Sequence, residues 1–233
     1  MLSLTHDIHC HLLPSVDEGS RSYAESVRMA RTLEELGVTT VHATPHQFRF
    51  GNDRTNDDLR HRTRELTTHL DAAGGGLSVV AGAEYLLGER LLDALARDEA
   101  LLTWSHVTDA GAATRVLVEL PLRTPVVNVA RVAGLFLRRG IEPVMAHPER
   151  VTALATEPTR ARAWRAAGWR FQLDLLSLAG TYGSAARDLA DVYLHEGLYD
   201  HVGSDLHRST QLDDLVTAHG HMRRFLASQE PRS

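Results

Sequence analysis

The sequence predicts an α/β fold in which seven β-α units place a parallel sheet inside a layer of helices. The first observation behind this prediction is an alternation along all 233 residues. Short apolar runs with strand character are followed by longer amphipathic runs of helical period. The second observation is that histidine and carboxylate side chains recur where the apolar runs end. Repeated strand-helix units favour parallel strands, but periodicity alone does not separate a closed barrel from an open, doubly wound sheet.

The boundaries of the elements follow from apolar runs and from residues that cap or end them. In chain order, the expected strands cover residues 5–10, 38–44, 77–83, 115–118, 141–146, 169–174 and 201–204. The first helix is expected to begin at Ser22, because Glu25 suits a capping box, and to stop at Gly37. Two later helices stop at Gly140 and Gly168. The expected helices cover residues 22–36, 57–73, 88–97, 126–139, 159–167, 183–196 and 212–226.

Composition limits the classes of protein to which the chain can belong. No linker or low-complexity segment interrupts residues 1–233, so we expect a single domain. A formal charge of −5 and the lack of a strongly basic stretch argue against nucleic-acid binding. The single cysteine excludes an internal disulfide, and no apolar run approaches the ~18–20 residues of a membrane span. The candidate chemistry begins at His9, which leaves no room for a signal peptide, so we expect a cytoplasmic protein.

The segment His9-Cys10-His11 ends the first expected strand. Residues two apart on a strand project from the same face, so the two imidazoles lie side by side while Cys10 points to the opposite face. The turn residues that follow bring Glu18 back toward the strand end as an oxygen ligand. The candidate metal ligands that gather at the strand ends are His9, His11, Glu18, His46, Glu84, Glu119, His147, Asp205 and His207.

Five imidazoles and four carboxylates facing one cavity predict a cluster of divalent ions. The carboxylates would repel one another and take up protons unless cations compensated them. Mixed sets of this kind suit zinc, manganese or iron, and nine ligands are too many for one ion, so we expect two or three ions. In an open sheet with ~4.8 Å strand spacing, the outer strand ends would lie about 25–30 Å apart. A barrel collects all strand ends at one mouth, so shared ligation favours closure.

As a set, these motifs resemble a known superfamily. They are His9-Cys10-His11, Thr44-Pro45-His46, Gly82-Ala83-Glu84, Val118-Glu119, Ala146-His147-Pro148-Glu149-Arg150 and Gly203-Ser204-Asp205-Leu206-His207. The chain resembles the polymerase-and-histidinol-phosphatase (PHP) superfamily. Within it, the resemblance is to the bacterial manganese-dependent protein-tyrosine phosphatases of capsule and exopolysaccharide gene clusters. The resemblance extends from residue 6 to about residue 207, with the order and spacing of the motifs kept.

The resemblance implies a distorted seven-stranded (β/α)7 barrel, TIM-like, with three divalent metal ions at the C-terminal mouth of its strands. Manganese is the ion implied, with iron or zinc as alternatives. By resemblance, the first ion would be held by His9, His11, Glu84 and Asp205, the second by Glu18, His46 and His207, and a third by Glu84 as a bridge with Glu119 and His147. The family pattern has aspartate where this chain has Glu18, so Asp17 is an alternative ligand.

The resemblance also implies catalytic roles. It makes Arg150 a phosphate-binding group, and a guanidinium fork suits phosphoryl oxygens that gain charge in the transition state. The alternative for Arg150 is a surface ion pair with Glu149. The acid that protonates the leaving oxygen is not fixed by the sequence, and His46 and His207 are the candidates for it.

Other polar residues near the strand ends receive structural interpretations. Arg49 and Arg208 flank residues of the mouth. We expect both to be solvated charges, with binding of an anionic substrate as the alternative. Asp174 is expected to be a satisfied polar group of the core, with a role in orienting a ligand imidazole as the alternative. Because the only thiol, that of Cys10, faces away from the histidines, the sequence argues against a thiolate phosphatase mechanism.

The function expected on these grounds is metal-dependent hydrolysis of a phosphomonoester. The resemblance favours phosphotyrosine in the tail of a bacterial tyrosine kinase of polysaccharide biosynthesis as the substrate and partner. A small phosphate ester such as histidinol phosphate is the nearest enzymatic alternative, because fold and metals do not set the substrate. An alternative of another class is a module that binds metal or a partner without catalysis. The sequence leaves the oligomeric state open.

Overall fold

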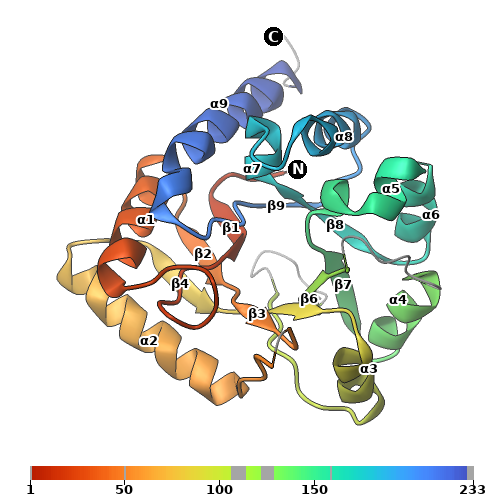
Figure 1. Cartoon of the computed structure of the whole chain (residues 1–233), viewed down its shortest axis with the longest axis horizontal. Helices are drawn as coiled ribbons and strands as arrows, with labels where there is room; N and C mark the ends of the chain where they lie inside the picture. The colour runs from red at the N-terminus through yellow and green to blue at the C-terminus, as the bar shows by residue number, and fades with distance from the viewer. Residues whose placement is uncertain (1, 50, 106–113, 122–128, 158, 230–233) are drawn as a thin grey trace.

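The computed structural model describes residues 2–49, 51–105, 114–121, 129–157 and 159–229. Its strands occupy the centre and its helices follow one another around them (Figure 1). The strands are β1 (His6–Cys10), β2 (Thr40–Ala43), β3 (His46–Gln47), β4 (Ser78–Ala81), β5 (Glu84–Leu86), β6 (Thr114–Glu119), β7 (Ile141–Met145), β8 (Arg170–Asp174) and β9 (His201–Gly203). All seven expected strands are confirmed, and β3 and β5 are additional short ones.

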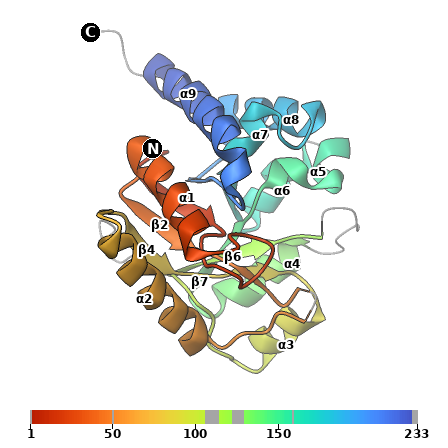
Figure 2. The ribbon, with the colours of Figure 1, turned by 60° about the vertical axis from the view of Figure 1, so that its left-hand side comes forward.

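The helices pack outside the strands, with α1 and α2 on one side of the molecule and α4 to α6 on the other (Figure 2). They are α1 (Tyr23–Glu35), α2 (Asn56–Ala72), α3 (Glu89–Ala96), α4 (Val129–Leu137), α5 (Thr152–Thr156), α6 (Arg160–Ala166), α7 (Leu175–Ala179), α8 (Ser184–His195) and α9 (Leu212–Gln229). The start of the helix expected over 126–139 lies outside the described residues. The short helices α5 and α7 were not expected, because five residues show no helical period. No helix in the described ranges combines the length and apolar character needed to cross a membrane.

The strands form two parallel sheets, with the orders β1-β2-β4 and β3-β5-β6-β7-β8-β9. The predicted α/β class and parallel pairing are confirmed. In place of one continuous seven-stranded ladder, the ladder is interrupted where β2 passes into β3 and β4 into β5. Pro45 lies at the first break and has no N–H to donate. Gly82 lies at the second, where a Cβ atom would come within 2.8 Å of Thr44 Cγ2.

The free edge of β1 lies against the chain that follows β9. His9 O accepts a hydrogen bond from Asp205 N at 2.8 Å, and Leu206 O accepts one from His11 N at 3.0 Å. Cys10 and Leu206 form a parallel bridge between these two segments. The sheets therefore curl toward each other, and their strand ends face a common region at the centre of Figure 1.

An apolar floor closes this region from below. Ile8, Trp104, Leu117, Val144 and Ala146 form a buried cluster separate from the main core. Because side chains two apart on a strand share a face, Glu119 at the end of β6 projects from the same face as Leu117 of this floor. The larger core lies between the strands and the helices, where its bulkiest buried side chains include Met29, Leu59, Phe136, Trp169 and Tyr193.

Helix α1 fixes the segment after β9. Ser22 Oγ accepts the hydrogen bond of Glu25 N at 3.2 Å, which is the N-cap half of the expected capping box. The Glu25 carboxylate accepts from Arg21 N at 3.0 Å and, across the fold, from Ser209 N at 3.1 Å. Arg208, expected to be solvated, places NH1 3.8 Å from the same carboxylate. These contacts fasten the segment that carries His207.

We predict that Gly203→Ala destabilises the protein, because the new Cβ would lie 2.5 Å from His9 Cβ and 3.1 Å from His9 N. Overpacking of this kind costs about 1–3 kcal/mol. The matched control is Gly88→Ala, since a Cβ at Gly88 meets nothing within 4 Å; a change at this helix N-cap should cost less than about 1 kcal/mol. Urea unfolding of both variants measures the difference, and equal losses would contradict the close approach of β9 to β1.

Candidate metal centre

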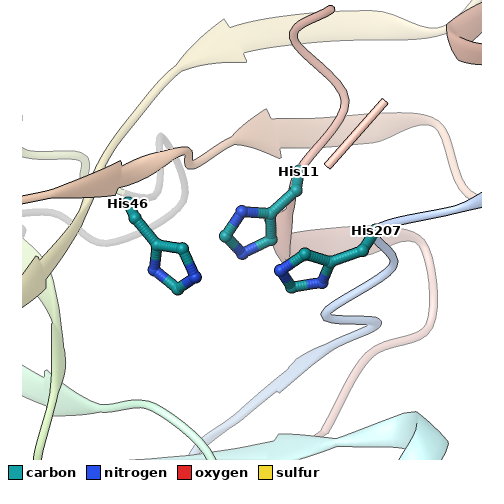
Figure 3. Close-up of side chains that lie close together, drawn as sticks. All are labelled: His11, His46 and His207. Carbon is teal, nitrogen blue, oxygen red and sulfur yellow. The ribbon is translucent and has the colours of Figure 1, made fainter. Parts of the chain in front are cut away.

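The nine predicted ligands all lie at the strand ends that face the central region. Glu84 begins β5, Glu119 ends β6, His46 begins β3 and His9 lies within β1. The other five follow directly or within loops after β1, β7 and β9. Figure 3 shows the rings of His11, His46 and His207 turned toward one another from three of these segments. The ring centroids of His11 and His46 are 4.6 Å apart, and those of His11 and His207 are 3.7 Å apart and stacked.

The carboxylate of Glu84 lies at the centre of the group and is fully buried. Its Oε2 atom is 3.4 Å from His9 Nε2, 3.5 Å from His11 Nε2 and 2.7 Å from His46 Nδ1. Its Oε1 atom is 3.0 Å from His147 Nε2. One carboxylate therefore contacts four imidazoles, which is the position that a bridging ligand requires.

Asp205 forms the opposite wall. Its Oδ1 atom lies 3.1 Å from His9 Nε2, 3.2 Å from His11 Nε2 and 3.6 Å from His207 Nδ1. Asp205 and His147 have left-handed backbone conformations, with φ of +50° and +35°. Residues with a Cβ rarely adopt this region, and such strain concentrates at functional sites because the surrounding structure must hold it in place.

Hydrogen bonds at the outer ring nitrogen orient three of the imidazoles. His9 Nδ1 is 3.0 Å from Gln172 Oε1, His11 Nδ1 is 2.8 Å from Asp17 Oδ2, and His207 Nδ1 is 2.8 Å from the backbone oxygen of Asp205. Because each neighbour is an acceptor oxygen, we assign the proton to Nδ1 in all three rings. The lone pair of Nε2 is then available to the centre of the cluster, as in metal-ligating histidines.

Asp17 and Glu18, the two candidate ligands of the turn after β1, have different partners. The oxygens of the Asp17 carboxylate are occupied by hydrogen bonds within the protein. They accept from His11 Nδ1, from Gly19 N at 2.9 Å and from His46 N at 2.9 Å. Glu18 is 53% exposed, and its Oε1 atom lies 3.3 Å from His46 Nε2. The geometry therefore favours Glu18 over Asp17 as the oxygen that faces an ion.

Electrostatic interactions within the cluster favour negatively charged carboxylates beside positively charged imidazoles. Burial would raise the pKa of Glu84, but His9 and His46 outweigh it and hold this pKa well below its usual range. Burial lowers the pKa of His9, yet the carboxylates of Glu84 and Asp205 outweigh it and raise this pKa well above its usual value. Burial and the neighbouring Glu84 raise the pKa of Glu119 to about 7. The carboxylates thus need positive charge, either as protons or as cations.

Buried side-chain oxygen and nitrogen atoms whose hydrogen-bonding capacity is not satisfied indicate where such cations would bind. Glu84 Oε2, Asp205 Oδ1 and His46 Nδ1 are buried and form no well-aligned hydrogen bond, although Glu84 Oε2 and His46 Nδ1 lie 2.7 Å apart and Asp205 Oδ1 lies 3.1 Å from His9 Nε2. Such atoms are costly unless a ligand satisfies them. Three groups of side chains place one ligand atom each within 4.8 Å of one another: His11 with His46 and His207, His9 with His11 and Glu84, and His46 with Glu84 and Glu119. This set of nitrogen and oxygen donors fits divalent transition metals.

Two arginines lie against the carboxylates of the cluster. Arg49, expected to be solvated, instead places NH1 2.7 Å from His46 Nε2 and 3.4 Å from Glu119 Oε2. The expectation of a solvated Arg49 was wrong. The contact with the buried Glu119 brings its side chain inward, and the position of Arg49 in the sequence does not indicate this contact. Arg150 NH1 donates to Asp205 Oδ2 at 2.5 Å and to Asp174 Oδ2 at 3.2 Å.

The alternative of a surface ion pair between Arg150 and Glu149 is also wrong. Glu149 is buried, and its carboxylate accepts from Asp174 N at 3.1 Å and from the hydroxyl of Tyr199 at 2.9 Å. Asp174 is buried and satisfied as expected, and it additionally contacts Arg150. Arg150 therefore belongs to the cluster rather than to the surface.

A family model described as "Capsular polysaccharide synthesis, CpsB/CapC" matches residues 5–219. The chain belongs to this CpsB/CapC family. The match covers every residue of the cluster and confirms the family predicted from the sequence motifs.

Curated relatives carry phosphatase names. Tyrosine-protein phosphatase YwqE of Bacillus subtilis strain 168 is 29% identical over 205 residues, which cover 86% of this chain and 76% of the relative. The putative tyrosine-protein phosphatase CapC of Staphylococcus aureus is 24% identical over 206 residues, covering 88% and 77%. Tyrosine-protein phosphatase CpsB of Streptococcus agalactiae serotype V is 25% identical over 207 residues, covering 86% and 82%.

A solved structure has the same fold. It comes from work on YwqE of Bacillus subtilis and CpsB of Streptococcus pneumoniae, described as unique metal-dependent tyrosine phosphatases. The similarity has a TM-score of 0.79 at 26% identity and covers 91% of this chain and 85% of the other. This agreement supports an α/β fold with a curled parallel sheet for this CpsB/CapC family member.

Sequence reasoning missed one residue of the centre. Gln172 Oε1 contacts His9 Nδ1 and also accepts from His147 N at 3.2 Å, so it holds ligands from two strands. The available signal was a polar residue between the apolar Phe171 and Leu173, two positions before Asp174. Two such residues share a face, which here is the face of the cluster.

We predict that divalent metal stabilises this CpsB/CapC protein. A ligand at one hundred times its dissociation constant contributes about 2.7 kcal/mol, which corresponds to a rise of about 5–10 °C in unfolding temperature for a domain of this size. Thermal unfolding after chelation and after Mn²⁺ addition measures the shift. Glu84→Gln should abolish most of it, whereas the exposed control Glu89→Gln should retain it. An equal shift in both variants would exclude Glu84 from ion binding.

Proposed function

We propose that the chain is a metal-dependent phosphatase that hydrolyses phosphotyrosine in proteins. The observation that carries this proposal is the buried cluster in which Glu84 contacts four imidazoles while Arg150 approaches from the rim. The family match and the phosphatase names of the relatives support the reaction and the substrate class. The proposed partner is the phosphotyrosine-containing tail of a bacterial tyrosine kinase, and a cytoplasmic location stays a prediction.

The proposal includes three ions, with manganese as the native one. The ion-binding residues would be His9, His11, Glu84 and Asp205 for the first, Glu18, His46 and His207 for the second, and Glu84, Glu119 and His147 for the third. The three ligand groups in close contact and the unsatisfied Glu84 Oε2 and Asp205 Oδ1 support this assignment. When bound, such ions polarise phosphoryl oxygens and lower the pKa of water so that it can act as a nucleophile at neutral pH.

The role proposed for Arg150 is to bind the phosphoryl group. Both of its hydrogen bonds to described residues use NH1, which leaves Nε and NH2 for an anion. Burial would lower the pKa of Arg150, but Asp205 and Asp174 outweigh it and raise this pKa, so the group stays charged. Donors fixed in advance stabilise the charge that develops on phosphoryl oxygens without reorganising during the reaction.

The proton for the leaving oxygen is assigned, as expected from the sequence, to His46 or His207. The side chain of His207 is 20% exposed, against 6% for His46. His207 is therefore the more accessible to a leaving group that enters from the mouth.

We also propose that the two sheets act as one distorted seven-stranded barrel around the centre. The hydrogen bonds between His9 and Asp205 and between His11 and Leu206 support closure between β1 and the end of β9. Chain continuity through Pro45 and Gly82 joins the sheets on the other side.

We predict that hydrolysis of p-nitrophenyl phosphate is lost on chelation and restored by Mn²⁺. The reason is that no thiol is available as a nucleophile at the centre: the only cysteine of the sequence, Cys10, is fully buried and its Sγ is directed toward Leu206 O. Initial rates before and after metal add-back provide the measurement. A protein that binds the metal but never hydrolyses the ester would instead be a non-catalytic binding module.

We predict that phosphotyrosine peptides are hydrolysed with a higher kcat/KM than histidinol phosphate. The side chains of Glu18 and His207 are 53% and 20% exposed, so we expect a substrate attached to a polypeptide to approach the buried centre from their side. Parallel assays of the two substrates on the metal-loaded protein decide between a protein substrate and a small-molecule substrate. A peptide rate no higher than that for histidinol phosphate would replace the tyrosine assignment with a small-molecule one.

We predict that Arg150→Ala lowers kcat/KM by about 10²–10³-fold, as for removal of a fixed donor to a developing oxyanion. Its metal content should stay nearly intact, whereas Asp205→Ala should lose both turnover and metal. Arg64→Ala, on the exposed face of α2, is the matched control and should retain both. Metal analysis beside the kinetics separates the roles, and loss of metal in Arg150→Ala would contradict phosphate binding as its main role.

A further inference from the structure

A cavity of about 400 Å³ lies beside the metal centre, between the turn after β7 with α5 and the start of α8. Helices α5 and α8 are neighbours at the upper right of Figure 1. The cavity is lined by Arg150, Thr152, Ala155, Tyr182, Ala185 and Ala186. A volume of this size is within the range of small-molecule sites in proteins.

Arg150 forms the boundary between this cavity and the centre. Its NH1 atom contacts Asp205 Oδ2 at 2.5 Å on the inner side, while the same residue lines the cavity on the outer side. The Arg150 guanidinium carbon lies 3.9 Å from the centroid of the Tyr182 ring. An anion bound by the remaining guanidinium N–H groups would therefore lie at the entrance of the cavity.

Tyr182 is fixed as a wall of the cavity. Its hydroxyl donates to Asp205 Oδ2 at 3.4 Å, which anchors the ring to the centre. Gly180 and Gly183 flank Tyr182 with φ of +83° and +95°, conformations that let the chain place this ring between α7 and α8. The ring is part of a defined turn rather than of a loose surface loop.

The lining combines mainly apolar groups with three polar residues, Arg150, Thr152 and Glu149. Three alanine methyl groups, the threonine and the tyrosine ring supply the walls. The one acidic residue that borders the cavity, Glu149, is 1% exposed, and both of its carboxylate oxygens accept hydrogen bonds from Asp174 N and Tyr199. A flat apolar group joined to an anion thus matches the walls and the arginine together.

We propose that this cavity binds the aromatic ring of an aryl phosphate ester, with Tyr182 as the wall that selects it. The inference rests on the proposed phosphatase function and assigns the residues that receive and select the aromatic ring at the same centre. In an aryl phosphate a single oxygen joins the ring to phosphorus, so the ring must lie beside the group that binds the phosphate. Arg150 is that group and lines the cavity. The space beyond one ring accommodates the peptide that carries it.

The test is the ratio of kcat/KM for p-nitrophenyl phosphate to kcat/KM for glycerol 2-phosphate, an alkyl ester. Ala185→Phe fills the cavity from an exposed position on α8 and should lower this ratio about tenfold, the scale on which an apolar pocket discriminates. Tyr182→Leu should lower the ratio as well, whereas Tyr182→Phe, which keeps the ring, should preserve it. Ala155→Phe fills the cavity from the opposite wall. It replaces Ala185→Phe in the test if that variant does not fold, and it should lower the ratio in the same way.

The matched control is Ala227→Phe, which places the same side chain on an exposed position of α9 away from the cavity and should leave the ratio unchanged. Circular dichroism and metal content establish that each variant is folded and loaded. If the wild type hydrolyses both esters in a metal-dependent manner but neither filling variant nor Tyr182→Leu changes the ratio, the cavity is not the aryl site and the phosphatase function stands. If the loaded wild type hydrolyses neither ester, both proposals fail.

Discussion

The interaction on which the structure depends is the contact of one buried carboxylate, that of Glu84, with four imidazoles from three separate segments. A charge removed from water is costly unless opposite charge and hydrogen bonds surround it. Here those partners come from β1, β3 and β7, so the strands must end at the same place for the charge to be tolerated. Parallel pairing satisfies this requirement, because it directs every strand end to one side.

The backbone adjusts where the cluster requires it. Asp205 and His147 keep left-handed conformations, and Gly203 allows β9 to approach His9 more closely than any residue with a side chain could. The sheet is also divided at Pro45 and Gly82, which turns β3 and β5 so that His46 and Glu84 pair in register. Local departures from regular geometry are concentrated at the site, while the outer layer of helices and its core remain regular.

Much of this arrangement was predictable from the sequence because its signals are local. Spacing of two along a strand placed His9 with His11, and the polar residue after each apolar run located Glu84, Glu119 and His147 at the mouth. The division into two sheets and the inward course of Arg49 were not predictable, because both depend on contacts between segments far apart in the chain. The cavity wall formed by Tyr182 depends in the same way on a turn that is defined only when α7 and α8 are packed.

Exposure differs sharply within the cluster, and this has a consequence for how ions enter and leave. The side chain of Glu18 is 53% exposed, whereas those of Glu84 and Asp205 are at most 2% exposed. Water can reach the Glu18 carboxylate directly and replace it as a ligand, whereas the carboxylates of Glu84 and Asp205 are closed off from solvent. In the proposed assignment, the second ion is therefore the labile one, and its exchange rate governs how the enzyme responds to the supply of metal.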